Sequence, residues 1–255
     1  MDRVTLFGTQ IDRVNMAEAV ATIGDWCRED RGDACRFVVT PNVNHIVMLR
    51  SNDALQRAYE HAALIVLDGT PLVWCARLLG KPVPERVAGS DLVPALFRSI
   101  APNEELTAYL LGAAEGVAER AKLLAEQRYP RLRIVGTYSP PFGFERDEQE
   151  NRKILERIAM ASPQVLVLGL GAPKQELWID RHRHAIQAKV ALCVGATIDF
   201  LAEAQPRAPT WMRRAGLEWA FRVAREPRRL ALRYARDGWA FPQVLFDEIR
   251  RGKDR

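Results

Sequence analysis

Short apolar runs alternate with amphipathic segments along most of the chain. The continuous runs are Phe37–Val39, Leu64–Leu67, Leu106–Leu111, Ile134–Tyr138, Val165–Leu170 and Val190–Val194. Nearly every run ends in a cluster of Gly, Pro or Asp, and a helical pattern follows. Runs of this kind are typical of strands buried on both faces of a mainly parallel sheet. We therefore predict a Rossmann-like α/β fold with helices on both faces of the sheet.

The N-terminal part of the chain adds two shorter patterns. Two apolar segments, Val4–Leu6 and Ile11–Val14, flank a glycine and predict a β-hairpin. Asn15 and Glu18 have the spacing of a capping box, which predicts a helix over Met16–Arg28.

Helices are also expected after the first two buried runs. The pattern that follows Thr40-Pro41-Asn42 is helical to about Ala62, and the second run ends in Asp68-Gly69-Thr70-Pro71. Proline is favoured at the first turn of a helix, so Pro71 predicts the start of another one.

Composition places the chain among ordinary globular proteins. Of its 255 residues, 48% are hydrophobic and 27% are charged, which excludes a disordered or collagenous chain. The four cysteines are scattered without a C-x-x-C pair, which argues against a zinc knuckle or a disulfide framework. No stretch approaches the roughly 18–20 apolar residues of a transmembrane helix. Acidic residues near the N-terminus argue against a signal peptide, so we expect a cytosolic protein.

The excess positive charge lies at the C-terminal end. Residues 205–255 carry twelve Arg and one Lys against six acidic residues, interleaved with aromatic side chains. This composition suits nucleic acid. It equally suits the surface of an anionic bilayer, to which each basic residue contributes roughly 1 kcal/mol of binding energy. A helical pair docked on its own core with a solvated basic face is the third interpretation.

The same segment differs from the rest of the chain in its pattern. Residues 205–209 are typical of a linker, and residues 210–250 are helical in pattern, with breaks expected at Pro227 and Pro242. We predict two parts: an α/β core over residues 1–204 and a basic helical appendage over residues 205–255.

A glycine-rich turn follows the fifth apolar run. Gly169-Leu170-Gly171-Ala172-Pro173-Lys174 resembles a dinucleotide-binding loop, but Lys174 replaces the third glycine and no acidic residue ends the next strand. Such a turn can hold an anion with its backbone N–H groups, or it can be a plain strand–helix connection. Gly112–Gly116 is a second and weaker loop of this kind.

Several polar residues follow the predicted strands. Asp68 ends a buried run, where a carboxylate can act as a general base toward a hydroxyl or simply bind the backbone of its own turn. Thr40 and Asn42 end the preceding run and could reach the same cleft or cap a helix. Asp199 has the same two interpretations. Because ligands of α/β sheets bind outside the carboxyl ends of the strands, these positions are the candidate site.

A metal site is not expected from the sequence. The chain has no D-x-D triplet, and its four histidines do not have the spacing of ligands on one helix face. A bound diphosphate would therefore need Arg, Lys or backbone N–H groups.

Seven short motifs, in this order, closely resemble those of the WecG/TagA/CpsF glycosyltransferases. They are Thr40-Pro41-Asn42, Leu67-Asp68-Gly69, Arg86-Val87-Ala88-Gly89-Ser90-Asp91, Gly171-Ala172-Pro173-Lys174-Gln175-Glu176, Val194-Gly195-Ala196-Thr197-Ile198-Asp199, Gly216-Leu217-Glu218-Trp219 and Glu226-Pro227-Arg228-Arg229-Leu230. The resemblance runs from about residue 4 to 240. It implies inverting transfer of a sugar from a UDP-sugar to a polyprenyl-diphosphate-linked saccharide, at the cytoplasmic face of the membrane, in surface polysaccharide biosynthesis.

The resemblance also implies roles for individual residues. Asp68 becomes the catalytic base, and Thr40 and Asn42 line the acceptor pocket. The residues implied near the donor are Gly171, Pro173, Lys174, Gln175, Glu176 and Asp199. Gly112, from the second glycine-rich loop, is predicted to bind the donor as well. The residues of the implied acceptor loop are Arg86, Gly89, Ser90 and Asp91. The arginines implied to close over the diphosphate are Arg222, Arg229 and Arg233.

This chain departs from the family pattern at two positions. Leu232 stands where the family often has Arg, so Arg233 is a candidate substitute, and Glu203 stands where many members have Gly. The resemblance implies no cofactor and no metal, contact with an anionic membrane surface, no nucleic acid partner and possible self-association. N-acetylmannosamine, its uronic acid, glucose and other hexoses are all compatible with the motifs.

Two other functions are weighed against this one. A nicotinamide-dependent oxidoreductase is disfavoured by Lys174 in the glycine-rich turn. A nucleic-acid-binding module would use the basic C-terminal segment.

Overall fold

The computed structural model describes residues 2–253, without the side chains of residues 214, 229 and 251–253. Its centre is a six-stranded parallel sheet with the strand order β4-β3-β8-β7-β5-β6. The sheet strands are β3 (Arg36–Val39), β4 (Leu64–Ile65), β5 (Leu106–Gly112), β6 (Leu132–Tyr138), β7 (Val165–Gly169) and β8 (Val190–Cys193). The predicted hairpin is confirmed as β1 (Arg3–Leu6) and β2 (Thr9–Asp12), a separate antiparallel pair.

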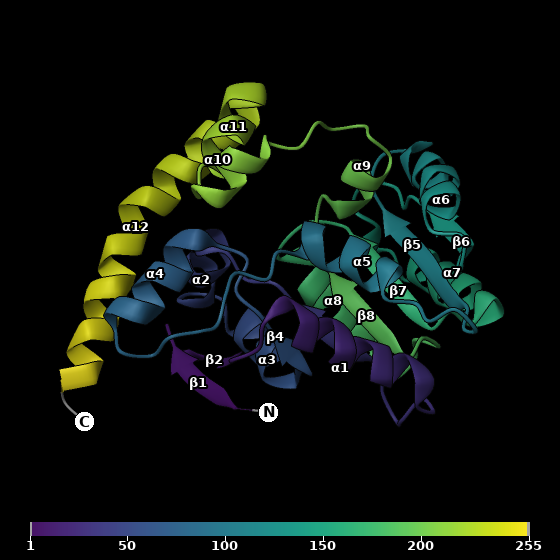
Figure 1. Cartoon of the computed structure of the whole chain (residues 1–255), viewed down its shortest axis with the longest axis horizontal. Coiled ribbons are helices and arrows are strands. Elements are labelled where there is room, and N and C mark those ends of the chain that lie inside the picture. Colours follow the sequence, from purple (N-terminus) through teal and green to yellow (C-terminus); the bar gives the residue numbers. More distant parts are fainter. Residues whose placement is uncertain (1, 254–255) are drawn as a thin grey trace.

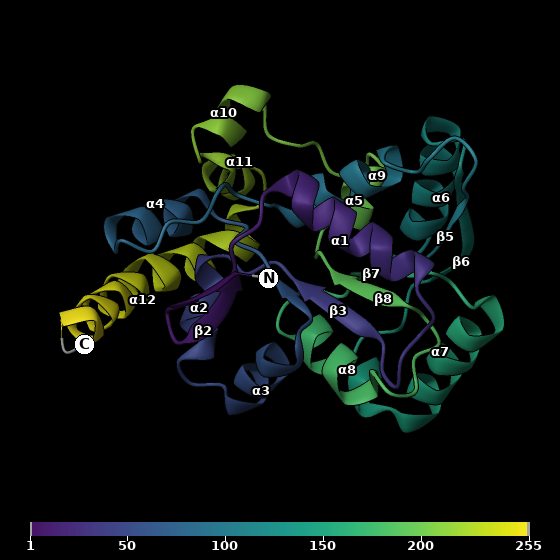
Figure 2. The same cartoon turned by 60° about the horizontal axis from the view of Figure 1, so that its bottom comes forward.

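Helices cover both faces of the sheet, as predicted (Figure 1 and Figure 2). One face is covered by α1 (Met16–Arg28), α5 (Gly89–Arg98), α6 (Val117–Arg128) and α9 (Thr197–Leu201). The other is covered by α2 (Val43–Leu49), α3 (Asp53–His61), α4 (Thr70–Leu78), α7 (Glu148–Ala161) and α8 (Lys174–His182). A short 3₁₀ helix, η1 (Phe144–Arg146), precedes α7.

The apolar runs form strands because burial on both faces removes the usual alternation with polar residues. Val38, Val167 and Leu192 face one layer of helices, whereas their neighbours along each strand face the other layer. Two hydrophobic clusters, one on each face, therefore make up the core.

Two helix boundaries show what local signals decide. The capping box of α1 is present, with the Asn15 side chain accepting from the N–H of Glu18 and the Glu18 carboxylate accepting from the N–H of Asn15. The expected helix to Ala62 is two helices, α2 and α3. Asn52 separates them because its side chain accepts from the N–H of Leu55 and so caps a new helix.

The C-terminal helices α10 (Thr210–Arg214), α11 (Glu218–Arg225) and α12 (Pro227–Lys253) follow the expected linker. The break at Pro227 is confirmed. The prediction of a break at Pro242 is wrong, because α12 continues through this residue. Pro242 is exposed, so water can reach the carbonyl of Gly238 that loses its intrahelical partner, while Val244 is buried against the core.

The helix α12 is docked along the core rather than extended from it. It runs beside α2 from the carboxyl end of the sheet toward the hairpin (Figure 1). Asp237 accepts a 2.9 Å hydrogen bond from the Asn44 side chain, and Glu248 forms a 2.9 Å ion pair with Lys81. Within residues 2–253, no helix combines the length and the hydropathy needed to cross a bilayer.

Candidate active site

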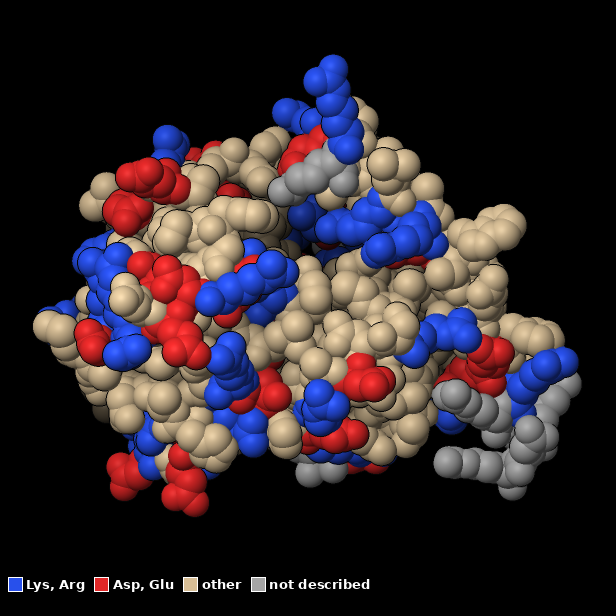
Figure 3. Space-filling model, turned by 180° about the vertical axis from the view of Figure 1, so that it is seen from behind, with Lys and Arg blue, Asp and Glu red and all other residues tan. Residues whose placement is uncertain are grey.

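A cleft of about 150 Å³ opens at the carboxyl ends of β3, β4 and β8, beneath α11 and the first turns of α12. Its lining from the core includes Asn42, Asn44, Asp68, Thr70, Arg86 and Ser90. Its lining from the C-terminal helices includes Glu218, Trp219, Arg222, Arg233, Tyr234 and Asp237. Seen from behind, Lys and Arg side chains gather around a hollow in the upper part of the molecule (Figure 3). Both parts of the chain therefore contribute to one cleft.

Asp68 lies just beyond β4, held by a 2.8 Å hydrogen bond from its own N–H to the carbonyl of Pro41. Its side chain is 27% exposed, at the wall of the cleft. Burial raises the pKa of this carboxyl to about 7, and the negative charges of Glu218 and Asp91 add to the shift, whereas Arg86 and the N–H of Gly89 oppose it. A carboxyl with a pKa near neutrality can accept a proton from a bound hydroxyl.

Arg86 connects the carboxylates around this position. Its guanidinium lies 3.8 Å from Asp68, 3.3 Å from Glu218 and 3.2 Å from Asp91. Glu218 belongs to α11, so Arg86 ties the C-terminal helices to the core at the cleft.

Two of the predicted arginines face the cleft from the C-terminal helices. Arg222 comes from α11 and Arg233 from α12, and neither forms an ion pair with any residue that the structure describes. The Nε atom of Arg233 is buried without a hydrogen-bond partner. Leu232 is 81% exposed and does not line the cleft, so Arg233 holds the position facing it. The side chain of Arg229, also predicted here, lies outside the described residues.

Some of the remaining residues predicted near the acceptor line the cleft, and others are buried behind its wall. Asn42 lines the cleft and its side-chain oxygen also caps α2, so both of its interpretations hold. Thr40 is buried and does not line the cleft; its hydroxyl donates to the carbonyl of Cys193 and links β3 to β8. Gly89 packs closely against the Val194 side chain in the wall of the cleft. A Cβ at this position would lie only 2.8 Å from that side chain, so a larger residue would crowd it.

Gln175 and Glu176 are buried below the cleft rather than on its surface. The Gln175 side chain accepts from the N–H of Gly195 and donates to Glu176, and so supports the loop after β8. Burial raises the pKa of Glu176 to about 7 and lowers the pKa of neighbouring His45 to about 4. Tyr59 completes this cluster through a 3.2 Å hydrogen bond to His45. Nothing in the sequence pattern pointed to His45 or Tyr59.

The predicted glycine-rich loops meet beside the cleft, where the strand connections diverge. From β5 the chain moves outward to β6, whereas from β7 it moves inward to β8, which makes this boundary a topological switch point. Gly112 has φ +120°, and a Cβ there would lie 2.5 Å from the carbonyl carbon of Gly169. Only glycine allows these two loops to approach so closely.

The other predicted donor-side residues belong to the same edge of the sheet. Gly171 has φ +78°, and Pro173 immediately precedes α8. The Lys174 ammonium lies 3.5 Å from Glu145 and over the rings of Phe142 and Phe144. Neither these residues nor Asp199 of α9 line the cleft around Asp68.

Sequence reasoning did not single out the roles of Asn44, Glu218, Tyr234 and Asp237. Glu218 stands in a quoted motif, but its approach to Arg86 depends on how α11 folds back. Within the described residues, no three His, Cys, Asp or Glu side chains gather as metal ligands would.

Comparison with known proteins agrees with the motifs. The glycosyl transferase WecG/TagA/CpsF family matches residues 4–255. The chain is similar to a Staphylococcus aureus (strain MRSA252) enzyme named N-acetylglucosaminyldiphosphoundecaprenol N-acetyl-beta-D-mannosaminyltransferase, with 28% identity over 228 residues. A relative of the same name from strain MW2 is 27% identical. Each comparison covers 89% of this chain and 87% of the relative. Because the family match spans almost every residue and agrees with the motifs around the cleft, the chain belongs to the WecG/TagA/CpsF family and is a glycosyltransferase.

Proposed function

We propose that this enzyme transfers N-acetylmannosamine from its UDP derivative to an N-acetylglucosamine that is linked through a diphosphate to a polyprenol. The names of the relatives support this pair of sugars and the lipid-linked acceptor. One observation carries the proposed chemistry: the Asp68 carboxyl lines the same cleft as Arg222 and Arg233. These two arginines form no ion pair with any of the described residues.

The proposed reaction is a single displacement. The acceptor hydroxyl oxygen attacks the anomeric carbon and its proton passes to the Asp68 carboxylate. The bond from that carbon to the β-phosphate oxygen breaks at the same time, and UDP leaves with the electron pair. Attack opposite the leaving group inverts the anomeric centre. A pKa of about 7 suits the base, because proton transfer is most effective when this pKa lies near the working pH.

The leaving diphosphate gains negative charge as the bond breaks, and in this proposal Arg222 and Arg233 stabilise it without a metal ion. Guanidinium groups bind phosphate oxygens through paired, charge-assisted hydrogen bonds. Loss of one preorganised donor typically lowers the rate by about 10²–10³.

The C-terminal helices also present a surface suited to a membrane on the cytoplasmic side. Their exposed apolar side chains include Trp211, Trp219, Leu232, Trp239, Phe246 and Ile249. Exposed arginines such as Arg225 and Arg228 accompany them. Tryptophan favours the headgroup level of a bilayer and arginine favours anionic lipids, so contact here would bring a lipid-linked acceptor to the cleft. Self-association stays a prediction.

The transfer is tested with UDP-N-acetylmannosamine and a short-chain prenyl-diphosphate N-acetylglucosamine. Wild type should form the disaccharide, Asp68→Asn should not, and Asp30→Asn, which changes an exposed carboxylate, should behave as wild type. Turnover by Asp68→Asn at the wild-type rate would contradict the base assignment. In thermal-shift titrations UDP should stabilise the protein, whereas stabilisation by NADH or by an oligonucleotide instead would favour one of the two alternative functions.

Membrane contact is tested by sedimentation with anionic liposomes. Leu232→Ser with Trp239→Ser should weaken binding, because both side chains are 81% exposed on α12. The control, Leu123→Ser with Met160→Ser, removes comparable exposed side chains from α6 and α7. It should leave liposome binding unchanged. Equal sedimentation of the two double variants would contradict the proposed surface.

A further inference from the structure

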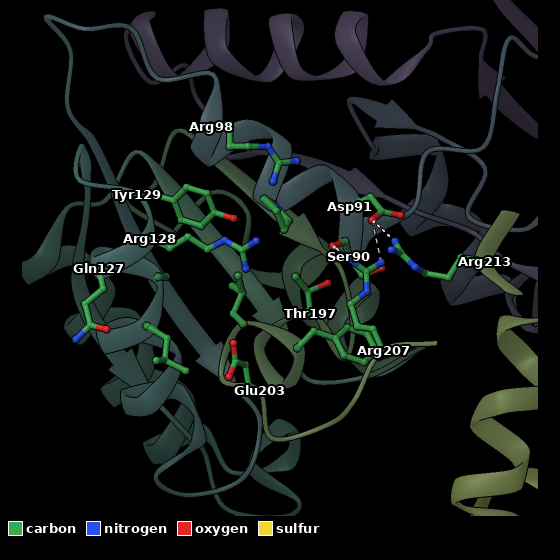
Figure 4. Close-up of a pocket in the computed structure, with 15 residues that line it drawn as sticks. Ser90, Asp91, Arg98, Gln127, Arg128, Tyr129, Thr197, Glu203, Arg207 and Arg213 are labelled. Carbon is green, nitrogen blue, oxygen red and sulfur yellow. Dashed lines mark hydrogen bonds and ion pairs between the residues drawn. The ribbon is translucent and has the colours of Figure 1, made fainter. Parts of the chain in front are cut away.

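A second and larger cavity, of about 520 Å³, lies on the outer face of the helical layer between α5 and α6 (Figure 4). Thr197, Phe200 and Leu201 of α9 contribute to its lining. Ser90 and Phe200 line both this groove and the catalytic cleft, so the two cavities are neighbours. Four arginines also line the groove: Arg98, Arg128, Arg207 and Arg213.

Two of these arginines already have structural partners. Arg207 and Arg213 donate to the same oxygen of Asp91, at 2.9 and 3.2 Å. Arg207 also donates to the carbonyl of Ser90, which has no intrahelical donor because Pro94 stands four residues later. These two arginines fasten the linker and α10 to α5.

The other two arginines are available to a ligand. Arg98 at the end of α5 and Arg128 at the end of α6 are exposed, and neither forms an ion pair within the described part of the chain. Figure 4 shows them on the same side of the groove, with the Tyr129 hydroxyl pointing toward its centre. Tyr129 is 94% buried, yet its hydroxyl has no hydrogen-bond partner among the described residues. This corner of the groove therefore offers two positive charges and an unused hydroxyl.

Glu203 adds an acceptor at a cost in backbone strain. It lines the groove with φ +52°, in the left-handed region that favours glycine. The family resemblance has glycine at this position in many members, and this conformation gives the physical reason. A non-glycine residue in this region is disfavoured because its Cβ crowds the following carbonyl oxygen. Backbone strain that persists at a cavity is typical of a functional site.

We propose that this groove binds a saccharide that carries a carboxylate or a phosphate. Arg98 and Arg128 hold the anionic group, and the Tyr129 hydroxyl and the Glu203 carboxylate bind sugar hydroxyls. Phe200 and Leu201 supply the apolar contact that the face of a sugar ring needs. An anion without hydroxyls would use the arginines alone, so the combination selects a charged sugar. The site is separate from the catalytic cleft and does not depend on which sugar is transferred there.

Calorimetric titration of the full chain tests the proposal with glucose 1-phosphate and glucuronate as probes. At least one of them should bind with one site per chain, and glucose should bind at least tenfold more weakly. Inorganic phosphate should also bind at least tenfold more weakly than glucose 1-phosphate. Equal affinity for inorganic phosphate, or no binding of either charged sugar, would overturn the proposal.

Three variants place the site. Arg98→Gln with Arg128→Gln should lower the affinity for the charged sugar at least tenfold. The control, Arg120→Gln with Arg131→Gln, removes the same amount of charge from exposed positions outside the groove. It should change the affinity for the charged sugar less than twofold. Tyr129→Phe keeps the ring packing and should also weaken binding. Unchanged affinity in the first double variant would overturn the site.

A fourth variant separates this groove from the catalytic cleft. Arg222→Gln alters only the cleft and should leave the affinity for glucose 1-phosphate unchanged. If Arg222→Gln abolishes binding, the charged sugar occupies the cleft and the groove proposal is wrong. Binding at the groove can therefore succeed even if the proposed transfer reaction fails.

Discussion

The raised pKa that suits Asp68 to its proposed role as a base also makes this side chain a source of instability. An aspartate in the unfolded chain has its ordinary pKa of 3.8, whereas in the folded protein the pKa is about 7. The folded state therefore binds this proton more tightly, and the contribution of Asp68 to stability is most favourable at low pH. As pH rises from about 4 to about 7, the folded protein must keep an ionised carboxylate in a site that disfavours it.

The size of this effect follows from the difference between the two pKa values. Each unit corresponds to about 1.36 kcal/mol, so ionised Asp68 lowers the free energy of unfolding by at most about 4 kcal/mol above pH 7. The side chain is 27% exposed, and solvent screening reduces this upper bound. Asparagine removes the ionisation while keeping an oxygen that can accept from the N–H of Gly89.

Urea unfolding of wild type and Asp68→Asn at pH 4 and pH 8 measures the effect. The variant should be more stable than wild type by about 2–4 kcal/mol at pH 8 and by less than about 1 kcal/mol at pH 4. Glu176 also has a pKa of about 7, but it is present in both proteins and cancels in the comparison. Asp30→Asn is the control and should show no such dependence on pH. A stability difference for Asp68→Asn that is equal at both pH values would refute the reasoning, as would an activity that does not rise through about pH 7 in wild type.

Three further substitutions test other parts of the structure. Gly112→Ala should lower the free energy of unfolding by about 2 kcal/mol or more, measured in urea, because the new Cβ meets the backbone of β7. The control Gly143→Ala has φ +84° but open space around the new Cβ, and it should cost only about 1 kcal/mol. Equal losses would show that crowding at position 112 is relieved elsewhere. Glu203→Gly should raise stability by about 1 kcal/mol, while the control Ala204→Gly should not, and a loss in both would contradict the strain at position 203. Arg222→Gln should lower kcat/KM for sugar transfer by about 10²–10³ without lowering the melting temperature, and an unchanged rate would remove Arg222 from the reaction.

The sequence by itself determined the elements whose signals are local. Continuous apolar runs identified the buried strands, and the Asn15–Glu18 box placed the start of α1, because strand burial and helix capping leave a trace within a few residues. The seven motifs identified the family. Asp68 could be singled out because carboxyl ends of parallel strands are where α/β proteins bind ligands. Local rules failed at Pro242, where packing of α12 against the core outweighs the lost hydrogen bond.

Tertiary structure decided which of these residues share a cleft and in what ionisation state. Pairing of β3 with β8 buries Thr40 as a support, and the core closes over Gln175 and Glu176, although the motifs grouped all three with the substrates. The fold of α12 presents Arg233 rather than position 232 to the cleft. Burial and nearby charges set the pKa of Asp68, and one of these charges, Glu218, comes from a helix far along the chain. A sequence pattern records neighbours along the chain, whereas desolvation and charge proximity arise only when the chain has folded.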